Sequence, residues 1–108
     1  MGGGLKPFSA YDLACAVLKG ILDRSKFDPA EIGEVVMGHC RQTSDDPNIA
    51  RIAALKVGIP ESVPAYTVMR QCASAMTAVQ QAAMSIMVGQ NDVCIAGGTE
   101  SMSNAVFY

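Results

Sequence analysis

Residues 65–98 read AYTVMRQCASAMTAVQQAAMSIMVGQNDVCIAGG, and this stretch decides the fold. It opens with a short run of β-branched and aromatic residues, 65–69, which is typical of a strand. An uncharged segment, 73–88, then runs on to a glycine and has the length and composition of a helix. A second apolar run, 93–98, predicts another strand. We therefore expect a strand–turn–helix–strand unit with Cys72 in the turn.

Cys72 is expected at the N-terminus of the helix in this unit. The first turn of a helix has unpaired backbone N–H groups and a partial positive charge, which together favour an anion. Because the thiolate is the nucleophilic form of cysteine, this position predicts a reactive side chain. Arg70 would add to the effect if its side chain points inward. An unpaired cysteine can equally be a small buried hydrophobic residue, so position alone leaves both interpretations open.

The chain before this stretch supplies a helix, a short strand and a second helix. Ser9-Ala10-Tyr11-Asp12 matches a capping box and predicts a helix that ends near residues 24–26. Residues 34–38 predict a short strand, and a polar loop follows it. Asp46-Pro47 predicts the cap of a helix that ends at Gly58.

The order of these elements predicts the fold class. Strands that alternate with helices imply an α/β domain with three parallel strands and right-handed crossover helices. The first helix has the apolar stripe of a crossover helix, but no strand precedes it. We therefore expect a partial domain whose first strand is absent.

Composition limits the function further. The 108 residues have room for one domain, and with half of them apolar, 17% charged and a net charge of −2 the chain is expected to form a core. The lack of basic excess and the few aromatic residues argue against nucleic-acid binding. The uncharged run 71–91 is long enough for a bilayer, but polar residues interrupt it. It predicts a helix buried on most sides, and no membrane span.

The four cysteines, Cys15, Cys40, Cys72 and Cys94, show no paired short spacing. This pattern predicts neither a zinc site nor a disulfide framework, and His39 is not expected to bind a metal without partners elsewhere. Scattered free thiols fit a reducing compartment, and the N-terminus shows no targeting segment, so we expect a cytoplasmic protein.

Two motifs resemble a known family. Residues 72–79, CASAMTAV, and 96–103, AGGTESMS, are similar to the active-site segment and the Gly-Gly-x-Glu-Ser-Met-Ser segment of thiolases, the acetyl-CoA acetyltransferase and 3-ketoacyl-CoA thiolase family. Upstream segments resemble the family in the same order: Gly3–Lys6, Tyr11–Ala14, Val36–Gly38 and Ala53–Pro60. The resemblance covers nearly the whole chain.

The resemblance implies that Cys72 is the catalytic nucleophile of an acyl transfer in fatty acid metabolism. In thiolases the matching cysteine attacks an acyl-CoA thioester, holds the acyl group covalently, and passes it to a second acyl-CoA or to CoA. Coenzyme A thioesters would then be substrates, with no permanently bound cofactor. The backbone N–H of Cys72 would form part of the oxyanion hole.

The resemblance also implies that much of the enzyme lies outside this sequence. Thiolases are several times longer, and their second half brings a Gly-His-Pro histidine and a Cys-x-Gly cysteine, while an inserted loop domain binds CoA. Residues 1–108 are therefore expected to be an incomplete N-terminal thiolase-like domain without turnover of its own. The absent first strand is expected to leave a gap in the middle of the sheet. Met69 and Ala73 depart from the usual Asn and Gly of the family, which bears on the shape of the turn.

Other functions remain open. The resemblance also implies a non-catalytic alternative: thiolases dimerise through the strand before the nucleophile, so residues 65–69 would be an open edge. An association module could pair through it with its own copy, as a homo-oligomer, or with a complementing thiolase chain. A redox-sensing thiol is disfavoured because no second cysteine lies near Cys72 in sequence. The ketoacyl synthase group also places a cysteine at a helix start, but residues 97–103 favour a thiolase.

Overall fold

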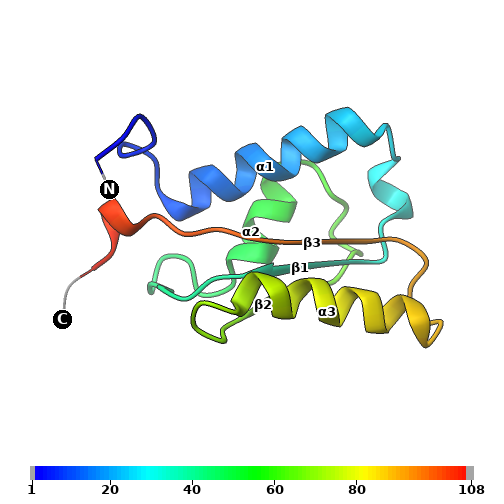
Figure 1. Cartoon of the computed structure of the whole chain (residues 1–108). Coiled ribbons are helices and arrows are strands. Elements are labelled where there is room, and N and C mark those ends of the chain that lie inside the picture. The colour runs from blue at the N-terminus through cyan, green and yellow to red at the C-terminus, as the bar shows by residue number, and fades with distance from the viewer. Residues whose placement is uncertain (1, 107–108) are drawn as a thin grey trace.

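The computed structural model describes residues 2–106 and has an α/β architecture (Figure 1). Its elements are α1 (Ala10–Ser25), β1 (Glu34–Gly38), α2 (Ile49–Lys56), β2 (Ala65–Val68), α3 (Ser74–Met87) and β3 (Cys94–Gly98). Short 3₁₀ helices lie at Pro29–Glu31 and Met102–Asn104. The three strands are parallel, and helices alternate with them, as the element order predicts.

The sheet is continuous, in the order β2-β1-β3. Val36 of β1 is paired with Tyr66 of β2 on one side and with Ala96 of β3 on the other. The predicted gap in the middle of the sheet is therefore wrong. Because β1 uses both of its hydrogen-bonding sides, no further strand fits between these three, and any additional strand would have to join at an edge.

The first helix begins as predicted. The Ser9 hydroxyl accepts the amide of Asp12 at 3.1 Å, and the Asp12 carboxylate accepts the amide of Ser9 at 2.9 Å, which completes a capping box. The predicted cap of the second helix at Asp46-Pro47 is wrong, because the N-cap of α2 is Asn48. Asn48 also accepts the hydroxyl of Thr67 in β2 at 2.8 Å, so a contact with the sheet fixes where α2 begins.

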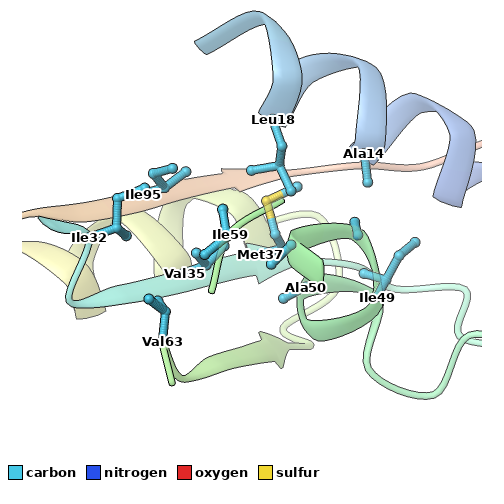
Figure 2. Close-up of a cluster of buried hydrophobic side chains, with 12 residues drawn as sticks. Ala14, Leu18, Ile32, Val35, Met37, Ile49, Ala50, Ile59, Val63 and Ile95 are labelled. Carbon is cyan, nitrogen blue, oxygen red and sulfur yellow. The ribbon is translucent and has the colours of Figure 1, made fainter. Parts of the chain in front are cut away.

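The main hydrophobic core lies on one face of the sheet, beneath α1 and α2 (Figure 2). Alternate residues of β1, Val35 and Met37, point into it and are essentially inaccessible to solvent. Leu18 of α1 and Ile49 of α2 close over them. This packing holds the sheet in place against α1 and α2.

Helix α3 covers the opposite face of the sheet (Figure 1) and makes contact through small side chains. Its buried residues are Ser74, Ala78, Ala82 and Ser85. The expectation of a helix buried on most sides is wrong, because Met76 is 63% and Met87 is 82% exposed. No helix within residues 2–106 is long and apolar enough to cross a bilayer.

The segments at the two ends of the described chain lie side by side. Thr99 donates its hydroxyl proton to the carbonyl of Ala10 at 2.9 Å, and Ser101 donates to the carbonyl of Phe8 at 2.8 Å. The Asn104 amide reaches the same Phe8 carbonyl at 2.8 Å. These side-chain bonds attach the segment after β3 to the start of α1.

Replacing Ser9 with alanine should lower the free energy of unfolding by about 1 kcal/mol, because the helix loses its N-cap acceptor. Hydrogen bonds from the Ser9 backbone and then from its side chain hold the pKa of Asp12 below its usual range. A lowered folded-state pKa stabilises the protein above the unfolded pKa, and that stabilisation is lost as pH falls through the folded pKa. Urea unfolding should therefore show a larger loss at neutral pH than at about pH 2.

The control for this measurement is Ser44→Ala, at an exposed loop position, which should leave stability unchanged at both pH values. An equal loss for Ser9→Ala at the two pH values would show that the cap and the carboxylate are not coupled.

Candidate active site

The segments that follow the three strands meet at one edge of the sheet, because the carboxyl ends of parallel strands share that edge. They surround an open pocket of about 300 Å³. The residues that line it are Gly38, Cys40, Gln71, Cys72, Ser74, Ala75, Gly98, Thr99 and Glu100. All three strand ends contribute to the pocket.

Two paired glycines let α3 begin directly on the sheet. Gly38 of β1 lies opposite Gly98 of β3. A Cβ atom added at Gly38 would lie 2.4 Å from the backbone nitrogen of Ala75, and one at Gly98 would lie 2.7 Å from the Cβ of Ala75. Any side chain at either position would push the helix away, so the glycines fix the position of its first turn.

The connection from β2 to α3 is a tight turn with its own hydrogen bonds. Gln71 has φ of +49°, in the left-handed region that residues with a Cβ rarely adopt. The buried hydroxyl of Ser74 accepts the amide of Arg70 at 2.7 Å and donates to the carbonyl of Gln71 at 2.7 Å. These bonds close the turn around Cys72.

Cys72 is exposed and lies in this turn, two residues before the first residue of α3. The N-cap residue, Ala73, makes no side-chain hydrogen bond to the first turn. The position of Cys72 at the helix start agrees with the position that the sequence predicts, and its exposure argues against the interpretation as a buried hydrophobic residue. Arg70 is also exposed.

Glu100, to which the sequence pattern assigns no role, organises the loop after β1. Its carboxylate accepts the amide of Cys40 at 2.9 Å and that of Arg41 at 3.1 Å. It also lies 3.0 Å from Nδ1 of His39, a ring nitrogen that is 2.9 Å from the carbonyl of Thr99. Since both neighbours of Nδ1 are acceptors, this nitrogen carries the proton. Within residues 2–106, His39 belongs to no group of three potential metal ligands.

Cys40 is the second residue that sequence reasoning missed. Its thiol donates to the carbonyl of Gln71 at 2.8 Å and is 3.3 Å from the hydroxyl of Ser74. Although 31 positions separate Cys40 from Gln71, the fold brings Cys40 and Cys72 into one pocket. No second cysteine lies near Cys72 in the sequence, but Cys40 lies in the same pocket in the fold. The available signal was the place of Cys40 just after a parallel strand.

The remaining cysteines lie outside this pocket. Cys15 is in α1, and Cys94 begins β3, so it lies toward the other end of the sheet. Burial raises the pKa of the Cys94 thiol; the contact with the Ser85 hydroxyl opposes this to a smaller extent, and the charge of Glu34 adds the smallest contribution to the increase. Cys94 is therefore a poor nucleophile at neutral pH.

The family is clear from a comparison with known domains. A model described as the N-terminal domain of thiolase matches residues 1–108. The chain belongs to the thiolase family, and its match lies in the N-terminal domain of that family.

Particular relatives agree with this assignment. The chain is 46% identical to the "Probable acetyl-CoA acyltransferase" of Staphylococcus epidermidis and 43% identical to that of Staphylococcus aureus, each over 104 residues. These matches cover 96% of this chain and 26% of each relative. The chain thus spans about a quarter of the length of these proteins.

Solved structures give the same result. The acetyl-CoA acetyltransferase of Bacillus anthracis matches all of this chain with a TM-score of 0.94 at 44% identity, over 27% of its own length. A thiolase from Ascaris suum in complex with coenzyme A also has a TM-score of 0.94, at 35% identity, over 28% of its length. The fold of the described residues is therefore part of the thiolase fold.

The close approach of α3 to the sheet predicts that Gly38→Ala destabilises the protein by about 3 kcal/mol, because the new Cβ meets backbone atoms that cannot rotate away. Gly97→Ala is the matched control in the same sheet. Its Cβ would make an ordinary contact of 3.6 Å with the sulfur of Met37, so stability should change by less than about 1 kcal/mol. Chemical denaturation measures both values.

A second control is Gly20→Ala, where nothing lies near the added Cβ. This change should stabilise α1 by about 0.5–1 kcal/mol, since alanine is the better helix former. If Gly38→Ala were as stable as Gly97→Ala, the first turn of α3 would not depend on the glycine pair.

Proposed function

We propose that this chain carries the acyl-accepting nucleophile of a thiolase-type acyl-CoA acyltransferase, and that the nucleophile is Cys72. The observation that supports this most directly is the exposed Cys72 side chain in a pocket at the start of α3, a helix without a side-chain cap. The first-turn amides and the helix dipole favour an anion there, first the thiolate and then the oxyanion of the tetrahedral intermediate. The coenzyme A bound by the Ascaris suum thiolase supports a CoA thioester as substrate.

The chemistry begins with attack of the Cys72 thiolate on the thioester carbonyl. The tetrahedral oxyanion collapses, the bond to the CoA sulfur breaks, and CoA leaves as a thiolate while the acyl group stays on Cys72. In the degradative direction a CoA thiolate takes the acyl group from Cys72. In the synthetic direction the α-carbon of a second acyl-CoA takes it and gives up a proton. One thioester is exchanged for another in the first step, so a good nucleophile and a stabilised oxyanion are its main requirements.

The second step needs proton transfers for which these residues offer no evident group. The Gly-His-Pro and Cys-x-Gly segments of thiolases do not occur in residues 1–108. The one histidine, His39, is buried, and its Nδ1 is held by the Thr99 carbonyl and Glu100. General acid–base steps worth roughly 10²–10⁴-fold each would be lost. We therefore propose that these 108 residues act as an incomplete N-terminal domain that needs the remainder of a thiolase chain for turnover.

Incubation with acetyl-CoA should acylate Cys72 slowly and selectively, with no measurable thiolysis of acetoacetyl-CoA. Cys94 should be labelled least, because burial raises its pKa and lowers its thiolate fraction. Peptide mapping by mass spectrometry measures the acyl group on each cysteine. Cys72→Ser should abolish most of the label, whereas Cys15→Ala should leave it unchanged. Label spread evenly over the four cysteines would contradict a privileged thiol, and turnover at an ordinary enzymatic rate would contradict the incomplete domain.

A second candidate function is association through β2, without catalysis by this chain. The supporting observation is that β2 lies at an edge of the sheet, where one hydrogen-bonding side has no partner strand within residues 2–106. Such an edge can pair with a second copy of this chain or with a complementing thiolase chain. Sedimentation equilibrium should then show a concentration-dependent dimer. A clean monomer at high concentration would remove self-association.

A further inference from the structure

The turn that carries Cys72 contains a strained residue that needs support from its surroundings. Gln71 adopts φ of +49°, which a residue with a Cβ disfavours. Its carbonyl oxygen receives the amide of Ser74 at 3.1 Å and the hydroxyl of Ser74 at 2.7 Å. Both of these donors belong to the turn itself, so they close the turn without fixing it to the sheet.

Cys40 supplies a side-chain link between this turn and the loop after β1. Its thiol donates to the same Gln71 carbonyl at 2.8 Å and is 3.3 Å from the Ser74 hydroxyl. Within residues 2–106, it is the one side chain from outside residues 70–74 that hydrogen-bonds to this turn. The Ser74 hydroxyl and the Cys40 thiol each have one proton to donate, and both groups lie within hydrogen-bonding distance of the Gln71 carbonyl.

Cys40 is itself held in place from the third strand. Glu100, just after β3, accepts the amide of Cys40 at 2.9 Å through one carboxylate oxygen. Its other oxygen accepts the amide of Arg41 at 3.1 Å. A carboxylate that accepts two backbone amides makes charge-assisted bonds, which are stronger than neutral ones. The loop after β1 is therefore a fixed support, from which the Cys40 thiol reaches the turn after β2.

The geometry points to Cys40 as a positioning residue for Cys72. By holding the carbonyl of Gln71, Cys40 keeps the left-handed turn closed and keeps Cys72 in the pocket at the start of α3. The inference rests on the proposed role of Cys72. Its test, however, measures the reactivity of Cys72 toward a simple electrophile and requires no acyl transfer.

The test compares two substitutions that differ in the ability to donate. Cys40→Val keeps a similar volume and removes the donor, so the rate of Cys72 alkylation by iodoacetamide should fall by roughly fivefold, the factor expected for one hydrogen bond of ordinary net strength. Cys40→Ser keeps a donor and should stay within about twofold of the unsubstituted chain. Cys15→Ala is the control and should have no effect. Thiols are fully reduced beforehand, and peptide mapping reports the rate at Cys72 alone.

Circular dichroism and thermal unfolding establish that each variant is folded, and Cys40→Ala replaces the valine variant if valine does not fit. Recovery of the rate by serine separates positioning from a general loss of stability. A folded valine variant that reacts at the original rate would overturn the inference, and so would a serine variant as slow as the valine one. If acetyl-CoA fails to acylate Cys72 while the valine variant is still slow with iodoacetamide, the proposed function fails and the positioning role stands.

Discussion

The site depends on the absence of two side chains. Gly38 and Gly98 lie opposite each other at the carboxyl ends of β1 and β3, and the backbone of α3 passes directly over them. The helix thereby begins at the edge of the sheet, where the strand ends gather. A helix held farther from the sheet would carry Cys72 away from the loops that follow the other two strands. The close approach of backbone to backbone therefore sets the position of the exposed thiol.

Hydrogen bonds between the loops that follow the strands then hold these loops together around the site. Glu100 fixes the loop after β1, and the Cys40 thiol of that loop reaches Gln71 in the turn after β2. Each contact joins segments that are far apart in the chain. The pocket is thus a product of the parallel topology, which brings three separate loops to one edge, and the acidic and thiol side chains there connect those loops.

The sequence predicts the features that depend on neighbouring residues. The strand at 34–38, the capping box at Ser9 and the strand–turn–helix unit around Cys72 follow from local patterns, and the structure contains each of them. The features that were missed depend on distant residues. Asn48 rather than Asp46 caps α2 because Asn48 also bonds to Thr67 in β2. The continuity of the sheet could not be read from local pattern, since strand order is a property of the whole fold.

The candidate site likewise has features that the sequence predicts and features that it does not. The place of Cys72 at a helix start follows from the spacing of glycine, strand and helix residues. The roles of Cys40 and Glu100 do not, because their partners lie 31 and 60 positions away. The exposed side of α3 was also missed, since an apolar composition does not say which of its faces the sheet covers. Small residues at helical spacing, such as Ala78 and Ala82, are the ones that contact the sheet.

The side-chain bonds between the first and last described segments have a consequence for how the chain folds. Ser101 and Asn104 reach back over 93 to 98 positions to Phe8 and Lys6, so each bond closes a loop of nearly the full chain length. Loop closure costs more entropy as the loop lengthens, and contacts of such high order form late. These ends should join after the sheet has nucleated and open first under native conditions, so their amide hydrogens should exchange well before those of β1.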